Sequence, residues 1–279
     1  MKAIHINHTL PFMQRTGAAE YAPEDFELLT TILSALKWRE HNGEIEMLTD
    51  KIGYEYYRSH GLLPIWDNVK ITFSDMNGIN TRMFWAAGKL FALAEQTAPV
   101  AVMDTDFIVW APIAFDFLPD AACIHFEPLY PDVYPGADYF KTKNNYHLSK
   151  NWDWTLDAAN TAFCVIKNNE LLKSYTSAAI EFMRNSEDCD DTLKYMVFAE
   201  QRLLPMCAAA MDCEIRAFSD LRRLFEDGEK YFTHVWGMKQ QMRDNPTLRT
   251  AFCIRCADRI RRDFPEYSQM LHKNNIPYF

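Results

Sequence analysis

Two aspartates one residue apart form the part of the chain whose residue types suggest chemistry. Asp104 and Asp106 follow the apolar residues 100–103, and a second apolar run, residues 107–110, comes directly after them. Side chains two residues apart in an extended segment point the same way, so both carboxylates can face one spot. Two carboxylates this close repel each other unless a positive charge lies between them. The pattern predicts a divalent cation that carries phosphate oxygens, whereas the alternative is a pair of turn carboxylates.

The segments around this motif predict a mainly parallel α/β sheet with helices on both faces. Strand and helix alternate along the first part of the chain, which is typical of that architecture. Strands are expected at residues 2–7, 44–49, 69–73 and 100–103, and helices at residues 23–42, 54–60 and 83–96. Residues 8–11 end in a proline and are expected to form a loop at the carboxyl edge of the sheet, where ligands bind in open α/β sheets.

The second half of the chain shows a less regular pattern. Prolines punctuate residues 111–146, where we expect an acceptor-facing loop. The later elements are expected to be a strand at 161–167, helices at 170–184 and 192–211 with a kink at Pro205, a strand-to-loop segment at 231–239 and a helical tail from 246. We therefore expect a catalytic domain over residues 1–245, divided near residue 110 into a nucleotide-binding half and an acceptor half. Residues 246–279 would form a basic tail packed on the same domain.

Composition and charge narrow the class of protein. The chain has 279 residues, a formal net charge of −9 and a pI near 5.4, which disfavours a nucleic-acid binder. Its seven cysteines are an odd number and no leader segment precedes them, so we expect a soluble protein of the reducing cytoplasm. Cys253 and Cys256 form one C-x-x-C without a partner pair, so we expect two reduced helix cysteines rather than a zinc site. The arginines of the tail favour either a solvated face or a peripheral contact with anionic lipid; they are Arg249, Arg255, Arg259, Arg261 and Arg262.

The order of elements and two short motifs resemble the GT-A fold nucleotide-sugar glycosyltransferases. In that family a D-x-D motif ends the fourth strand and holds Mn²⁺ or Mg²⁺ on the donor diphosphate. The second motif is H-V-W-G-M-K at residues 234–239. It is similar to the C-terminal H-x-x-G-x-x-K of glycogenin-like enzymes and of bacterial lipooligosaccharide and capsular sugar transferases, and it is one residue shorter before the lysine. The resemblance implies that Asp104, Asp106 and His234 bind the metal, and a neutral imidazole suits Mn²⁺ beside two carboxylates.

The same resemblance implies roles for further residues. The candidates for catalysis are Glu200, Gln201 and Asn160, and the candidates for binding the donor are Thr9, Asp50, Lys89, Thr105, Gly237 and Lys239. Several have a plain structural alternative. Lys89 could be a lysine that extends along a half-buried helix, Asp50 a helix N-cap, and His234 a surface histidine. Glu200 and Gln201 could lie on a solvated helix face.

The function expected from the resemblance is metal-dependent sugar transfer in a bacterium, as in polysaccharide biosynthesis. The donor would be a nucleotide-diphosphate sugar, with UDP favoured, the acceptor a saccharide or a lipid-linked saccharide, and the configuration retained. Glu200 would stabilise positive charge on the sugar or act as a nucleophile. One alternative is a non-catalytic protein that binds a nucleotide sugar. A haloacid dehalogenase-type phosphatase is disfavoured because three strands precede the motif and Ile108 stands where that class has a small hydroxyl residue.

Overall fold

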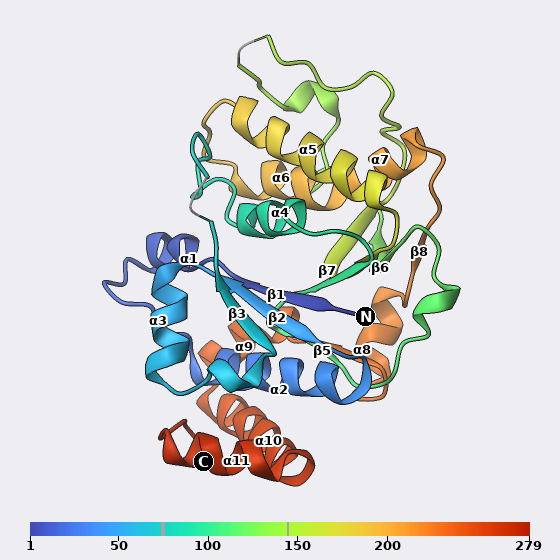
Figure 1. The fold of residues 1–279 in the computed structure, drawn as a ribbon. Coiled ribbons are helices and arrows are strands. Elements are labelled where there is room, and N and C mark those ends of the chain that lie inside the picture. Colours follow the sequence, from blue (N-terminus) through green and yellow to red (C-terminus); the bar gives the residue numbers. More distant parts are fainter. Residues whose placement is uncertain (74–75, 144) are drawn as a thin grey trace.

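A seven-stranded sheet with helices on both faces forms the body of the molecule (Figure 1). The computed structural model describes residues 1–73, 76–143 and 145–279. The strands of this sheet are β1 Ala3–Asn7, β2 Ile45–Thr49, β3 Asn68–Ile71, β4 Val100–Met103, β6 Ala121–Glu127, β7 Ala158–Ile166 and β8 Ile215–Ala217. The helices are α1 Thr9–Thr16, α2 Asp25–His41, α3 Lys51–Ser59, α4 Ala87–Ala94, α5 Asn169–Asn185, α6 Thr192–Val197, α7 Leu203–Ala210, α8 Leu221–Glu226, α9 Lys239–Asp244, α10 Pro246–Asp263 and α11 Pro265–Lys273.

The strand order is β3-β2-β1-β4-β7-β6-β8, and within the described sheet only β7 runs antiparallel to its neighbours. The carboxyl ends of β1, β2, β4 and β6 therefore share one edge with the amino end of β7. This arrangement confirms the predicted fold class, a mainly parallel sheet flanked by helices with a helical C-terminal extension. It also places the residues that follow β4 beside the residues that begin β7.

The sheet separates two hydrophobic cores because successive side chains of a strand point to opposite faces. Ile4 and Val102 pack with α4, α5 and α7 on one face, whereas Ala101 and Met103 pack with α2 and α10 on the other. Figure 1 shows α4 to α7 above the sheet and α2, α10 and α11 below it. Most of α2 is buried because it lies between the sheet and α10.

The loop expected at residues 8–11 is a helix. After β1 a single residue, His8, precedes α1, and Pro11 lies in its first turn. A proline is tolerated there because the first N–H groups of a helix have no intrahelical partner. The N–H of Thr9 instead donates to the carboxylate of Asp50, at 2.7 Å. A proline in the first turn is therefore compatible with a helix at this position.

Two other predicted helices differ from the structure. The helix expected from residue 83 begins at Ala87, because Asn80 caps a preceding turn through the N–H groups of Arg82 and Met83. The helix expected at 192–211 is interrupted by a π-helical turn, Phe198–Arg202, that precedes Pro205. A proline lacks the N–H that would bond four residues back, and the wider turn accommodates that loss. The break therefore falls around Glu200 and Gln201.

The strands β5 Phe107–Val109, β6 and β8 and the helices α8 and α9 were not predicted, whereas β9 Phe232–His234 lies in the predicted strand-to-loop segment at 231–239. β6 lies inside the proline-punctuated region, and its first five residues are buried, so its sequence shows no alternation. β5 and β9 form a separate antiparallel pair, and β8 and α8 are also short. Short elements carry too little periodicity to be recognised in one sequence. No helix among the described residues is long and apolar enough to cross a membrane.

Candidate metal centre

The turn after β4 brings the two aspartates of the motif to the carboxyl edge of the sheet. The N–H of Asp104 donates to the carbonyl of Ala162 in β7 at 2.7 Å, and the N–H of Phe107 donates back to the carbonyl of Asp104 at 3.0 Å. The chain therefore leaves the main sheet at Asp104 and enters β5. The carboxylates of Asp104 and Asp106 and the imidazole of His234 each offer a ligand atom, and these atoms all lie within 4.8 Å of one another.

The small β5–β9 sheet delivers the histidine. Its register pairs Phe107 with His234, and the N–H of Val235 donates to the carbonyl of Asp106 at 3.0 Å. The centroid of the Phe107 ring lies 5.5 Å from that of the His234 imidazole, and the Trp236 ring stacks on the same imidazole with centroids 6.1 Å apart. Backbone pairing thus fixes a residue from the C-terminal part of the chain beside the motif, where the sequence predicted it.

A lysine neutralises the second aspartate. Lys239 Nζ lies 2.8 Å from Asp106 Oδ2, and the Nε2 atom of His234 lies 3.8 Å from Oδ1. Burial raises the pKa of the Asp106 carboxyl, but the combined attraction of Lys239, His234 and Lys89 outweighs burial and holds this pKa at about 2. Burial also lowers the pKa of His234, so its imidazole is neutral at physiological pH and able to act as a ligand. The shortened spacing before Lys239 does not keep its ammonium from the site.

A second lysine lies between the first aspartate and a buried glutamate. Lys89 Nζ is 2.6 Å from Asp104 Oδ1 and 2.5 Å from Glu200 Oε1, and the hydroxyl of Thr161 donates to the same Glu200 oxygen at 2.7 Å. Burial raises the pKa of Asp104 to about 7, because the attraction of Lys89 is offset by repulsion from Asp106 and Glu200. Glu200 is 4% exposed, which excludes the solvated helix face.

Asn160 and Gln201 meet at a polar cluster that the sequence did not reveal. Asn160 Nδ2 donates to Glu127 Oε1 at 2.7 Å, and the hydroxyl of Tyr134 lies 2.7 Å from Glu127 Oε2 and 2.6 Å from Gln201 Oε1. Asn160 also accepts from the N–H of Ala162, whose carbonyl binds Asp104. Glu127 ends β6, an unpredicted strand, so no signal in the sequence pointed to it.

Thr9 and Asp50 have structural partners. Asp50 caps α3 through the N–H of Gly53 at 2.8 Å, as the N-cap alternative predicted, and its other oxygen binds the N–H of Thr9. The Thr9 hydroxyl also lies within 2.9 Å of both carboxylate oxygens. These contacts fix the starts of α1 and α3 beside the site, and roles of Thr9 and Asp50 in binding a donor stay predictions.

A cavity of about 130 Å³ adjoins Asp106. Asn7, Tyr21 and Tyr57 line one part of it, and Thr105, Asp106 and Lys239 line another. Asn7 Nδ2 donates to both tyrosine hydroxyls, at 3.0 and 2.7 Å, so the polar atoms of this wall are held in place. Gly237 lies farther along the second motif, where an added Cβ would meet only the ring of Phe225, at 3.7 Å.

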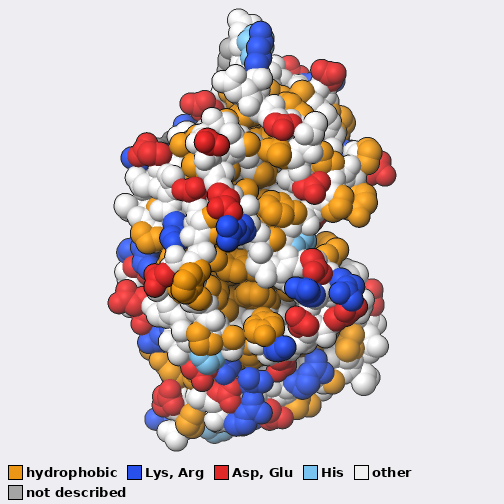
Figure 2. All heavy atoms as spheres, turned by 90° about the vertical axis from the view of Figure 1, so that its right-hand side faces the viewer, with side chains coloured by type: hydrophobic (Ala, Val, Ile, Leu, Met, Phe, Trp, Pro, Cys, Tyr) orange, Lys and Arg blue, Asp and Glu red, His pale blue; other side chains and the backbone are white. Residues whose placement is uncertain are grey.

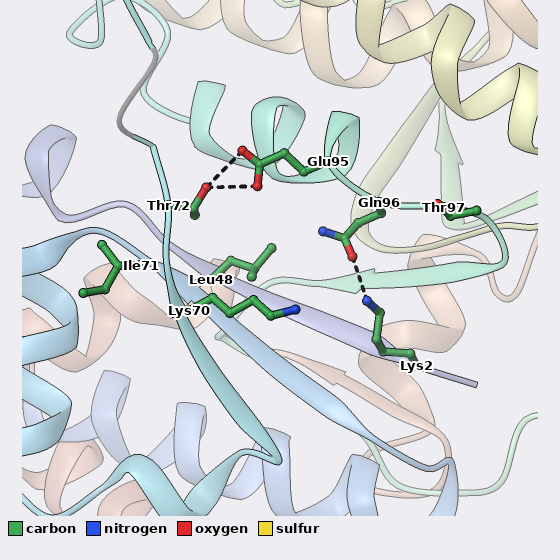
Figure 3. A pocket seen from close by; sticks show the side chains of 8 residues that line it. All are labelled: Lys2, Leu48, Lys70, Ile71, Thr72, Glu95, Gln96 and Thr97. Atoms are coloured by element: carbon green, nitrogen blue, oxygen red, sulfur yellow. Dashed lines mark hydrogen bonds between the residues drawn. The ribbon is translucent and has the colours of Figure 1, made fainter.

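A second cavity lies away from the predicted site residues (Figure 3). It measures about 450 Å³, and four of its polar side chains form two pairs: Lys2 with Gln96 at 2.8 Å, and Thr72 with Glu95. None of the residues predicted to act in catalysis or donor binding lines it. We therefore restrict the chemistry to the edge that carries Asp104 and Asp106.

The donor set at this edge fits a hard divalent cation. Two carboxylates and a neutral imidazole suit Mn²⁺ or Mg²⁺ with further oxygen ligands from a bound anion, as in many phosphate-handling sites. The two flanking lysines would repel a cation but attract a diphosphate, so the arrangement suits a metal that enters together with an anionic ligand.

Comparison with known proteins identifies a family. The sequence model of a family of unknown function, DUF6734, matches residues 13–273. The chain belongs to this family. No curated protein matches it.

The solved structures that align with this chain include glycosyltransferases. Mouse xyloside xylosyltransferase 1 in its apo form aligns with a TM-score of 0.40 and 11% identity over 78% of this chain and 85% of its own. The glycosyltransferase GlyE of Streptococcus pneumoniae aligns with a TM-score of 0.34 and 14% identity over 81% of this chain and 46% of its own. An active-site mutant of LgtC aligns with a TM-score of 0.36 and 11% identity over 71% and 70%. A specific similarity to glycogenin-like enzymes stays a prediction.

Proposed function

We propose that the protein is a metal-dependent glycosyltransferase that uses a nucleotide-diphosphate sugar, with UDP as the favoured nucleotide. The observation that carries the proposal is the convergence of Asp104, Asp106 and His234 within 4.8 Å, between Lys89 and Lys239. Two carboxylates, a neutral ring and two ammonium groups suit a bound diphosphate and its cation better than either ion alone.

The leaving diphosphate would lie between the metal ligands and the two lysines. Bound there, a Mn²⁺ or Mg²⁺ ion would neutralise phosphate charge as the sugar departs. Lys239, which is partly exposed and pairs only with Asp106 among its described salt-bridge partners, would offer its ammonium to a phosphate oxygen. Lys89 would keep Asp104 oriented, because its own charge is shared with Glu200.

The cavity beside Asp106 supports a nucleobase site. Ligand cavities for whole small molecules occupy roughly 300–1,000 Å³, so a cavity of about 130 Å³ would enclose only the base of a nucleotide. Tyr21 and Tyr57 offer aromatic walls, and Asn7 is fixed by both of their hydroxyls. Thr105 and Asp106 would then meet the ribose and diphosphate that follow the base.

The transferred sugar would lie over the cluster of Asn160, Gln201, Glu127 and Tyr134. Glu200 is enclosed by Lys89 and Thr161, and we infer that it acts by electrostatic stabilisation rather than as a nucleophile. Retention of configuration is part of the proposal and follows from the resemblance of the second motif. The anomeric proton signals of the product, read by NMR, decide between retention and inversion.

The test is a screen of nucleotide sugars for Mn²⁺-dependent hydrolysis, together with the thermal midpoint measured with UDP and Mn²⁺. The expected result is turnover of a UDP-sugar and a midpoint shift that needs both UDP and the metal. Asp106→Ala should abolish both, and the exposed Asp132→Asn is the matched control. Asp106→Ala with full metal-dependent hydrolysis would refute the site.

The same screen separates the alternatives. A UDP-dependent shift without turnover of any donor or acceptor identifies a nucleotide-sugar binder without catalysis. Release of phosphate from a phosphate monoester, with no response to nucleotide sugars, identifies a phosphatase of the haloacid dehalogenase type. Both outcomes contradict the transferase proposal.

A further inference from the structure

An exposed aromatic surface extends from the metal centre, and the proposed chemistry does not use it. Trp236 is 65% exposed although its ring stacks on the imidazole of His234. Phe225 of α8 is 53% exposed, and its ring is the side chain nearest to the open face of Gly237. Leu221, one helical turn before Phe225, is 48% exposed and lies on the same face of α8.

We propose that Trp236, Phe225 and Leu221, the aromatic platform, bind a pyranose ring of the acceptor saccharide. The inference rests on the proposed function and deepens it by naming the acceptor class and its binding surface. A saccharide presents C–H groups on one ring face and hydroxyls around its rim, so an exposed indole can cover the apolar face while the hydroxyls stay in water. Exposed aromatic groups that are contiguous with a polar site mark binding surfaces.

Continuity with the metal centre argues for an acceptor rather than an unrelated partner. The imidazole of His234 has two ring neighbours, the buried Phe107 and the exposed Trp236. A ring stacked on the outer face of Trp236 would therefore be separated from a metal ligand by one side chain. An acceptor hydroxyl must reach the anomeric carbon of a donor held by that metal, and the platform begins at the required place.

The charges around the platform disfavour a membrane as its occupant. Arg222 pairs with Glu226 at 3.2 Å, and Arg223 pairs with Asp220 at 3.4 Å. Farther along, Glu229 pairs with Arg259 at 2.8 Å. Because acids match these three arginines, they supply no surplus of positive charge for anionic lipid, which binds through clustered unpaired Lys and Arg.

The first experiment measures saccharide binding without donor or metal. Saturation-transfer NMR in EDTA is recorded with a panel of methyl glucosides, galactosides and xylosides and their disaccharides. The wild-type protein is expected to bind one or more members, Trp236→Ala to weaken binding at least fivefold, and Trp236→Phe to recover part of it. Phe225→Ala is expected to weaken binding less, and thermal midpoints check that each variant is folded.

Phe117→Ala is the matched control, because Phe117 is an aromatic residue with 83% exposure. It lies near Lys167, which follows β7 at the opposite edge of the sheet from Asp104, so it cannot reach the metal centre. Its variant should bind saccharide like the wild type. In turnover assays, Trp236→Ala should lower the ratio of transfer to hydrolysis at least tenfold, which a purely structural change at the metal centre would not do.

Four results would overturn the inference. The first is the absence of binding to every saccharide of the panel, and the second is unchanged saccharide binding by Trp236→Ala. The third is loss of the UDP-dependent midpoint shift in Trp236→Ala while saccharide binding stays intact. The fourth is sedimentation with phosphatidylglycerol vesicles that depends on Trp236, in place of saccharide binding. Saccharide binding through Trp236 in a protein that hydrolyses no nucleotide sugar would keep the platform as a saccharide site and refute only the proposed transfer.

Discussion

The metal centre and the junction between α2 and α10 are both rich in opposite charges, but the charges are arranged differently. At the junction, Asp263 accepts from Lys37 and Arg259 at 2.6 Å each and from Arg262 at 2.8 Å. Burial would raise the pKa of the Asp263 carboxyl, but these hydrogen bonds hold it well below its usual value. Each of the three cations is paired with the single carboxylate of Asp263.

At the metal centre the carboxylates face each other as well as their lysines. The pKa of Asp104 is raised to about 7 by burial and by neighbouring acids, although Lys89 lies at 2.6 Å. The junction thus uses its charges to hold the tail, whereas the centre keeps negative charge in excess at one spot. Excess charge of this kind lowers stability locally and provides binding energy for a cation.

The junction also bears on whether the arginines of the basic tail form a solvated face or a contact with anionic lipid. Arg249 binds Glu24 and Asp25 at the start of α2, and Arg261 pairs with Asp258. Figure 2 shows acidic and basic side chains interspersed over the lower part of the molecule on the face that it draws. These pairings favour the solvated-face alternative, and a peripheral contact with anionic lipid stays an untested prediction.

The largest effect is expected from a substitution at the metal centre. Asp106→Asn should lower metal-dependent turnover about 1,000-fold, or about 4 kcal/mol, since it removes a ligand and the partner of Lys239. The Mn²⁺-dependent rise of the thermal midpoint should disappear as well. Asp263→Asn, the matched change at the junction, should keep that rise while lowering the midpoint itself. Loss of the metal response in Asp263→Asn instead would show that the two regions are not independent.

The second largest effect is expected at the Lys89–Glu200 ion pair, where opposite charges stabilise each other as they do at the junction. Lys89→Met should lower the free energy of unfolding by about 3 kcal/mol, because Glu200 would remain buried without its cation. The double variant Lys89→Met with Glu200→Gln should recover part of this loss. Urea unfolding of both variants measures it. Equal stability of Lys89→Met and the wild type would contradict the pairing.

Lys239 should affect catalysis more than stability. Lys239→Met is expected to lower kcat by roughly 10- to 100-fold, since its ammonium would face the leaving diphosphate. Its free energy of unfolding should change by less than that of Lys89→Met, because the side chain of Lys239 is partly exposed whereas that of Lys89 is buried. Steady-state kinetics and urea unfolding on the same preparation provide the two numbers. The opposite pattern would assign Lys239 to structure.

The smallest effect is the pH dependence of the junction. The folded pKa of Asp263 lies below its unfolded value of about 3.9, so its ion pairs stabilise the protein above about pH 4 and lose that contribution as pH falls. Asp263→Asn should be less stable than the wild type by about 1 kcal/mol at pH 7, with the difference shrinking below pH 4. A difference that is constant between pH 7 and pH 2.5 would contradict this assignment.

The amino-acid sequence by itself determined the parallel half of the sheet and the predicted ligands. Residues 26–36 carry a helical period, residues 100–103 form a continuous apolar run, and the D-x-D and the histidine motif are local patterns. The seven cysteines were predicted to be reduced, and all are free in the structure. The domain division at residue 245 and the roles of the site residues stay predictions.

Only the tertiary structure decided which side chains meet. Local pattern could not show that β5 pairs with β9, which sets His234 beside Asp106, or that β6 brings Glu127 to Asn160. It predicted a loop at residues 8–11, because a cap supplied from Asp50, far along the chain, is invisible to local propensity. The physical reason is common to these cases: backbone pairing between distant segments and burial of short elements depend on contacts that neighbouring residues do not encode.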